Sequence, residues 1–161
     1  GKLDYLILDL PPGTGDIQLT LTQKLQITGA LIVTTPQDIA LADVRKGADM
    51  FKKVNTPVIG VVENMSGLIL KGEIENQASF ITINDEKIKV EKDGKFSYKV
   101  DLFKSGGGIE ESERLGVPLL GKIPISKNIT ESTDDGIPIS KSDPKSVIGN
   151  IFQKITERII N

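Results

Sequence analysis

Neither cysteine nor histidine occurs among the 161 residues of this chain. The lack of cysteine excludes disulfides, thiolate clusters and cysteine nucleophiles, and the lack of histidine excludes imidazole ligands and imidazole bases. A metal site built from these residues would therefore use oxygen ligands, which are the ligands of Mg²⁺ and Ca²⁺.

A strong charge of either sign is also lacking, because the formal net charge is -2. Without a basic field the sequence predicts neither a nucleic-acid partner nor an anionic membrane partner. No run of 18 apolar residues and no charged, apolar leader occurs, so we expect a cytoplasmic chain without a membrane span. The hydrophobic share of 38% is enough for one globular domain with a real core.

Short apolar runs are the main structural signal, and they fall at residues 3–10, 29–36, 56–65 and 117–124. Each run is continuous rather than alternating, which is typical of parallel strands buried on both faces. An amphipathic helix is predicted over 41–54, and a second over 143–161 with Asp143 as its N-cap and Pro144 in its first turn. The predicted fold class is α/β, with a partial, doubly wound and mostly parallel sheet.

Residues 70–103 break this rhythm. Apolar positions alternate there on both sides of Asp93-Gly94, a pair that favours a type I′ turn. We therefore predict an antiparallel hairpin insertion over 70–103 within a single domain that spans 1–161. Because the first strand would begin almost at Gly1, we also expect the chain to start inside a larger protein.

The stretch "LILDLPPGTGD" is the first candidate for chemistry, because an acid and a stiff loop follow an apolar run. Asp9 fits an acid that holds a Mg²⁺-bound water beside a phosphate, and it equally fits a strand-end Asp that caps a turn. In the loop that follows, Gly13 allows backbone N–H groups to approach an anion. Asp16 is interpreted as a helix N-cap, with a water-positioning role as the alternative.

Two further stretches carry possible ligand groups. Asn64 ends a predicted strand, where its amide could read a base edge or simply accommodate a turn. The run "KSGGGIEESERLG" could present N–H groups to an anion at a helix start, or it could be an ordinary hinge. It lacks the spacing of a P-loop. Asp43, Arg45 and Lys46 are interpreted as a solvated helix face.

Taken together, "LDYLILDLPPGTGDIQLTLTQ", "GALIVTTPQDIALADVRKGADMFKKVNTPVIGVVENMSG" and "GGGIEESERLGVPLLGKIPISKNITESTDDGIPI" closely resemble the C-terminal part of the Mrp-type, or ApbC-like, ATPases. These are iron–sulfur cluster carriers in the MinD/ParA branch of P-loop NTPases, of the SIMIBI type. The resemblance covers nearly the whole chain except the insertion.

The resemblance implies roles for individual residues and for partners. Asp9 would be the Walker B acid that holds Mg²⁺ through water, Gly13 would lie near the γ-phosphate in switch II, and Asp16 would complete the catalytic set. Asn64 would read adenine, and Ile123, Pro124 and Ile125 would pack beside the base. The cofactors implied are ATP and Mg²⁺, and the partners are a second copy in a homodimer and apo iron–sulfur client proteins.

Two departures from the family pattern narrow these expectations. The Walker A loop would lie upstream of Gly1, so we expect the fragment alone to be inactive as an ATPase. The Cys-x-x-Cys pair that follows the Asn-Met-Ser block in many relatives is missing, so an iron–sulfur cluster cannot be held here by thiolates. The alternatives are a MinD/ParA-like positioning ATPase and a nucleotide-dependent scaffold without a cluster.

Overall fold

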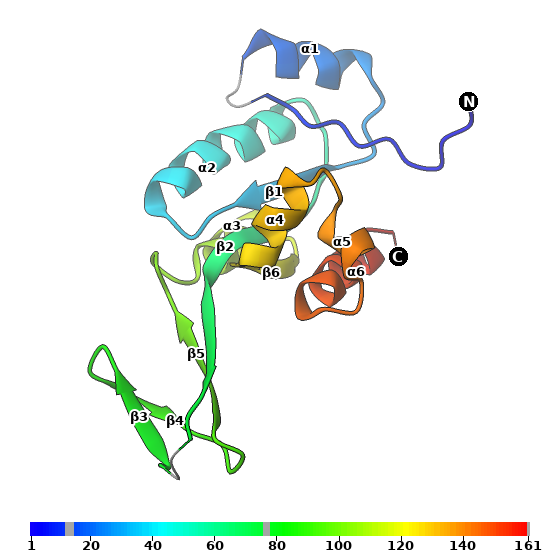
Figure 1. Ribbon diagram of the computed structural model, residues 1–161. Coiled ribbons are helices and arrows are strands. Elements are labelled where there is room, and N and C mark those ends of the chain that lie inside the picture. Colours follow the sequence, from blue (N-terminus) through cyan, green and yellow to red (C-terminus); the bar gives the residue numbers. More distant parts are fainter. Residues whose placement is uncertain (12–14, 76–77, 161) are drawn as a thin grey trace.

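The structure is a computed structural model that describes residues 1–11, 15–75 and 78–160. Figure 1 shows helices packed on a small sheet, with a long β arm projecting from it. The elements in chain order are α1 (Asp16–Lys24), β1 (Ala30–Thr34), α2 (Asp38–Lys53), β2 (Val58–Glu73), β3 (Phe80–Ile83), β4 (Glu86–Lys89), β5 (Lys95–Val100), α3 (Gly107–Leu115), β6 (Leu119–Ile125), α4 (Lys127–Asp134), α5 (Ile139–Ser142) and α6 (Val147–Ile160).

A parallel sheet forms the centre of the molecule, with β2 between β1 and β6. On one face Ile32 and Val61 pack with Ala48 against side chains from α2 and α3. On the other face Val62 and Leu120 pack with Ile155 of α6. Burial on both faces explains why these strands are continuous apolar runs in the sequence. The predicted α/β fold with a parallel sheet is confirmed.

β2 is 16 residues long and takes part in both parallel and antiparallel pairing. Its first half lies in the parallel sheet, whereas its second half, from Leu68 to Glu73, pairs antiparallel with β5. We call β2 from Leu68 onward, together with β3, β4 and β5, the arm (Figure 1). None of the helices in the described part of the chain is both long and apolar enough to cross a membrane.

The arm confirms an antiparallel insertion but corrects the predicted strand pairing. β4 pairs with β3 through a turn at Asn84 and Asp85, whose φ angles of 48° and 65° suit a type I′ turn. The predicted type I′ turn at Asp93-Gly94 does not form, because it needs positive φ at both residues and Asp93 is not among the residues with positive φ. The Gly94 N–H donates to the Glu91 carbonyl at 3.0 Å, so the chain turns one residue earlier, around Lys92 and Asp93. However, β5 leaves that turn to pair with β2. Alternating apolar residues identify a strand but do not identify its neighbour.

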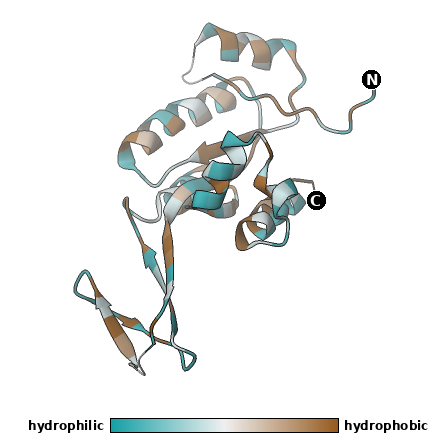
Figure 2. Ribbon diagram, in the orientation of Figure 1, coloured by the Kyte–Doolittle hydropathy of each residue, from teal (hydrophilic) through white to brown (hydrophobic). Residues whose placement is uncertain are grey.

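The predicted strand over 3–10 is wrong for this structure, which assigns no strand there. Leu6 and Ile7 are 71% and 91% exposed, although Figure 2 shows hydrophobic residues along this segment. The physical reason is the absence of a partner, because a strand needs a neighbouring backbone to take up its N–H and C=O groups and the segment joins neither described sheet.

Two helices begin at residues other than those predicted from the sequence. α1 begins at Asp16 with Gly15 as its N-cap, so Asp16 is the first helical residue and not the cap. α6 begins at Val147, and the Gly149 N–H donates to Ser146 Oγ at 3.0 Å. Ser146 therefore performs the capping that was predicted for Asp143, because the chain makes a turn after Pro144 before the helix starts.

Candidate functional site

The sheet brings Asn64 together with the segment Ile123–Ile125. Asn64 in β2 is the register partner of Ile123 in β6, at the carboxyl end of the parallel pairing. Beyond this point the ladder is interrupted, and pairing resumes only between Leu68 and Ile125. Ile123 and Pro124 are buried, and Asn64 is half-buried. The residues that the sequence proposed for base binding therefore lie at one edge of the sheet, where ligands bind in open α/β folds.

The Asn64 side chain is held by its own backbone. Its Oδ1 accepts a hydrogen bond from the Met65 N–H at 2.9 Å, and Met65 adopts a left-handed φ of 55°. Among the described residues, the Asn64 amide nitrogen has no hydrogen-bond acceptor. That NH₂ group is the part of the side chain available to a ligand.

A buried carboxylate lies directly before Asn64. Glu63 is 1% exposed, its Oε2 accepts the Gly108 N–H at 2.7 Å, and its Oε1 lies 3.4 Å from Lys122 Nζ. The glycine-rich start of α3 thus faces an anion, but the anion is the protein's own side chain. This contact was not predicted from the sequence, in which an acid at the end of an apolar run is its only signal.

The glycines at the start of α3 are explained by close packing. A Cβ on Gly108 would lie 2.7 Å from the Glu63 Cβ, and a Cβ on Gly107 would lie 3.0 Å from the Pro36 Cα. Real carbon atoms do not approach this closely without displacement. Gly106 precedes the helix with a φ of 90°, which favours glycine. The run Gly106–Gly108 therefore lets α3 reach the ends of β1 and β2.

Charged side chains also join α3 to α2. Glu111 is fully buried and binds Arg114 through both oxygens, at 2.9 Å and 2.7 Å. Arg45 Nε donates to Glu111 Oε2 at 3.3 Å, but the Arg45 side chain is 45% exposed and so still lies on the predicted solvated face. Its neighbours Asp43 and Lys46 do form an exposed pair. The hydrogen bonds to Glu111 raise the pKa of Arg114 above its usual value, and a bond to Asp49 adds to the effect.

Asp9 and Asp16, the candidate residues near the N-terminus, lie outside the sheet that carries Asn64 and Ile123. Asp9 is exposed in an extended segment, and Asp16 is exposed at the start of α1. Gly13 lies outside the described residues. Gln18 of α1 donates to the Pro11 carbonyl at 2.8 Å, which ties this helix to the preceding segment. Figure 1 shows α1 at the end of the molecule opposite β3 and β4.

The described residues contain no group of three or more acidic side chains able to hold a metal ion. A single carboxylate such as Asp9 is compatible with Mg²⁺ only where phosphate oxygens and water complete the coordination shell. Asp9 therefore fits an outer-shell contact to a nucleotide-bound Mg²⁺ and does not fit an independent metal site.

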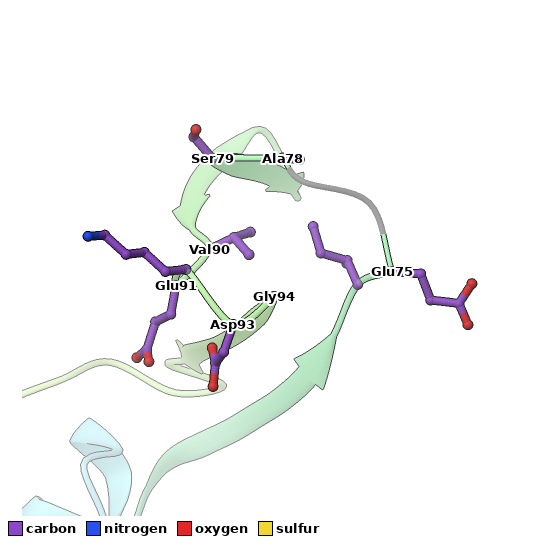
Figure 3. A pocket seen from close by; sticks show the side chains of 9 residues that line it. Glu75, Ala78, Ser79, Val90, Glu91, Asp93 and Gly94 are labelled. Atoms are coloured by element: carbon purple, nitrogen blue, oxygen red, sulfur yellow. The ribbon is translucent and has the colours of Figure 1, made fainter.

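A cavity of about 450 Å³ lies in the arm rather than beside Asn64. It is lined by nine residues, among them Val90, Glu91 and Asp93. Figure 3 shows the Glu75 carboxylate pointing away from those of Glu91 and Asp93, which extend in a similar direction. Because these carboxylates do not converge, the cavity does not present a cation site.

Comparison with known proteins agrees with the geometry. A ParA-type family model described as "NUBPL iron-transfer P-loop NTPase" matches residues 1–102 and 86–160. The nucleotide-binding protein of Archaeoglobus fulgidus, solved with ADP, superposes with a TM-score of 0.58 at 34% identity and covers 84% of this chain. The cell division ATPase MinD of Pyrococcus furiosus superposes with a TM-score of 0.53 at 26% identity, over 83% of this chain.

Curated relatives give the same assignment. The iron-sulfur cluster carrier protein of Pseudomonas fragi is 44% identical over 95% of this chain. The Arabidopsis thaliana iron-sulfur protein required for NADH dehydrogenase, which is mitochondrial, is 36% identical over 99% of it. The chain spans less than half of each relative: 45% and 44% of these two, and 46% and 42% of the two solved structures. The chain therefore belongs to the iron–sulfur cluster carrier family of ParA/MinD-type P-loop NTPases.

Proposed function

We propose that the complete protein binds and hydrolyses ATP with Mg²⁺ in the service of iron–sulfur cluster transfer. This chain would supply the half that recognises the base and senses the γ-phosphate. The observation that carries the proposal is the register pairing of Asn64 with Ile123, which gathers the base-binding residues at the carboxyl edge of a parallel sheet. An ADP-bound relative with the same fold supports a nucleotide as the ligand.

Asn64 would read the base. Because its Oδ1 is already bonded to the Met65 N–H, its NH₂ group would donate to a ring nitrogen of adenine. Ile123 and Pro124 are buried beside this position, and Ile125 is half-buried. These three residues would provide an apolar surface against the flat face of the base, as most cofactor sites do.

Asp9, Gly13 and Asp16 would act at the phosphates. The Asp9 carboxylate would orient a water of the Mg²⁺ shell, and the metal would neutralise charge on the transferred phosphoryl group. The backbone of Gly13 would contact the γ-phosphate, and Asp16 would position the attacking water. Switch segments of this kind order around the γ-phosphate and relax after hydrolysis, which provides a route to a changed dimer interface.

The iron–sulfur cluster would be cargo. The chain has no cysteine, so thiolate ligands for a cluster would have to come from outside these 161 residues. We propose a homodimer and apo iron–sulfur client proteins as the partners of the complete protein. Its relatives named as iron-sulfur cluster carriers support this assignment.

The test uses the complete gene product. Asp9→Ala should abolish Mg²⁺-dependent phosphate release while leaving a fluorescent ATP analogue bound, and Asn64→Ala should weaken binding of that analogue. Asp43→Asn is the matched control, because Asp43 is an exposed acid paired only with Lys46. If Asp9→Ala hydrolysed ATP at the wild-type rate, the proposed role of Asp9 would be rejected.

A further inference from the structure

We propose that Glu63 is a positioning residue that sets base selectivity by fixing the register of β2 against β6 beside Asn64. The inference rests on the proposed nucleotide function. In this proposal Glu63 does not contact the nucleotide and instead influences base binding by holding the backbone that carries Asn64.

The contacts of Glu63 span three elements. Its carboxylate in β2 accepts the Gly108 N–H of α3 at 2.7 Å and lies 3.4 Å from Lys122 Nζ of β6. Glu63 and Lys122 are register partners in the parallel pair. One side chain thus connects the strand that carries Asn64 to the strand that carries Ile123 and to a helix behind both.

The register pairs follow one another directly. Glu63 pairs with Lys122, and the next pair along the strands is Asn64 with Ile123. Successive side chains of a strand point to opposite faces, so Glu63 lies on the α3 face while Asn64 and Ile123 lie on the other. Beyond Asn64 the ladder is interrupted until Leu68, so the ion pair of Glu63 with Lys122 lies one register position before Asn64 and Ile123, close to where the pairing breaks.

The carboxylate is also tightly enclosed. Its side chain is 2% exposed, and the Gly108 backbone approaches so closely that a Cβ would lie 3.0 Å from Oε2. If the Glu63 carboxylate is removed, the buried Gly108 N–H loses its hydrogen-bond acceptor, which destabilises the fold. Replacing Glu63 by an apolar residue would therefore free α3 and β6 to shift relative to Asn64.

Glu111 offers a matched comparison within the same protein. It is as buried as Glu63, but its partners are Arg114 and Arg45, which join α3 to α2. Loss of Glu111 should loosen the fold without releasing the β2–β6 register beside Asn64. The two buried glutamates therefore separate a general loss of stability from a change in base recognition.

The experiment measures the ratio of the dissociation constants for GTP and ATP, with Mg²⁺, on the complete gene product. Asn64→Ala should lower this ratio roughly threefold to tenfold, which is the worth of one hydrogen bond. Glu63→Leu should lower it about threefold, because both contacts of the carboxylate are lost. Glu63→Gln should lower it less, about twofold, because the Gln oxygen still accepts the Gly108 N–H while the ion pair with Lys122 is lost. Glu111→Leu should leave the ratio at the wild-type value while lowering the urea midpoint.

Lys122→Met is the second variant, because the Lys122 side chain is 37% exposed and the hydrogen bond between Glu63 and Gly108 does not involve it. It should lower the ratio about twofold. If Glu63→Leu and Lys122→Met both kept the wild-type ratio while Asn64→Ala lowered it, Glu63 would be purely structural and the inference overturned. If Asn64→Ala itself left the ratio unchanged, the proposed base site and this inference would both fall.

Discussion

At the scale of single residues, Gly108 is packed closely against Glu63 of β2. Gly108→Ala would place a methyl group 2.7 Å from the Glu63 Cβ, so α3 or β2 must move. We expect the free energy of unfolding to fall by about 1–3 kcal/mol, measured by urea denaturation.

Gly47 provides the control for that substitution. It lies inside α2, and a Cβ there would meet nothing within 4 Å. Gly47→Ala should therefore raise stability by about 0.5–1 kcal/mol, because alanine restricts the unfolded chain and favours the helix. Equal effects at both glycines would contradict the packing of α3 against Glu63.

Glu111 is predicted to matter more for stability than any acid on the surface. Glu111→Leu leaves the Arg114 guanidinium with Asp49 as its remaining partner. We expect a loss of roughly 2 kcal/mol, less than the cost for a fully buried pair because Arg114 reaches solvent. Thermal denaturation should show a clear fall for Glu111→Leu and almost none for Asp43→Ala, whose Lys46 partner is exposed.

Asp93 makes a pH-dependent contribution to the arm. Hydrogen bonds from the Lys95 side chain and backbone lower the pKa of the Asp93 carboxyl below its usual value. A lowered pKa means that the stabilisation is present above the unfolded-state pKa and is lost as pH falls through the folded-state pKa. An NMR titration should show this low value, and Lys95→Met should move it upward. An unchanged value in that variant would exclude the Lys95 side chain as a cause, because the backbone N–H of residue 95 is still present.

At the scale of elements, the turn at Asn84 and Asp85 decides the β3–β4 pairing. Both residues have positive φ, which costs a β-branched side chain on the order of 1–2 kcal/mol. We expect Asp85→Val to speed amide exchange in β3 and β4, and Asp85→Gly to slow it. Equal exchange in the two variants would show that the turn does not control the hairpin.

The elements also show how far the sequence could predict this fold. The parallel strands near 30, 60 and 120 were predictable, because burial on both faces leaves continuous apolar runs. The pairing of β4 with β3 was not, since alternation around Asp93-Gly94 matches either partner. The capping by Ser146 was missed because Asp143-Pro144 carries the same signal three residues earlier.

The candidate site likewise has contacts that the sequence predicted and contacts that it did not. The meeting of Asn64 with Ile123 followed from the rule that parallel strands end at one edge. The bond from Gly108 to Glu63 did not, because no local pattern specifies how closely a helix approaches a strand. The roles of Asp9, Gly13 and Asp16 remain predictions.

At the scale of the whole molecule, apolar side chains are unevenly covered. Leu3, Tyr5, Leu6 and Ile7 are all more than 60% exposed, and Val33 of the edge strand β1 is 55% exposed. Exposed apolar surface of this extent favours association. The 161-residue chain should therefore self-associate at micromolar concentration, as measured by light scattering after gel filtration.

The double variant Leu6→Lys, Ile7→Lys tests that expectation. It removes two neighbouring apolar side chains that are 71% and 91% exposed, and it should shift the chain toward monomer. A monomeric wild-type chain at the same concentration would contradict the prediction. Circular dichroism of both forms controls for unfolding, because neither side chain is buried.

β2 gives the whole molecule a mechanical property. Its backbone continues as one strand from the core sheet into the arm, so no flexible linker separates the arm from the sheet along β2. The pairing with β6 is interrupted between Asn64 and Leu68, and a left-handed Met65 lies in that interval. This interval is where we expect β2 to bend when the arm moves. A displacement at the tip of the arm would be transmitted along the β2 backbone to this interval, which directly follows Asn64.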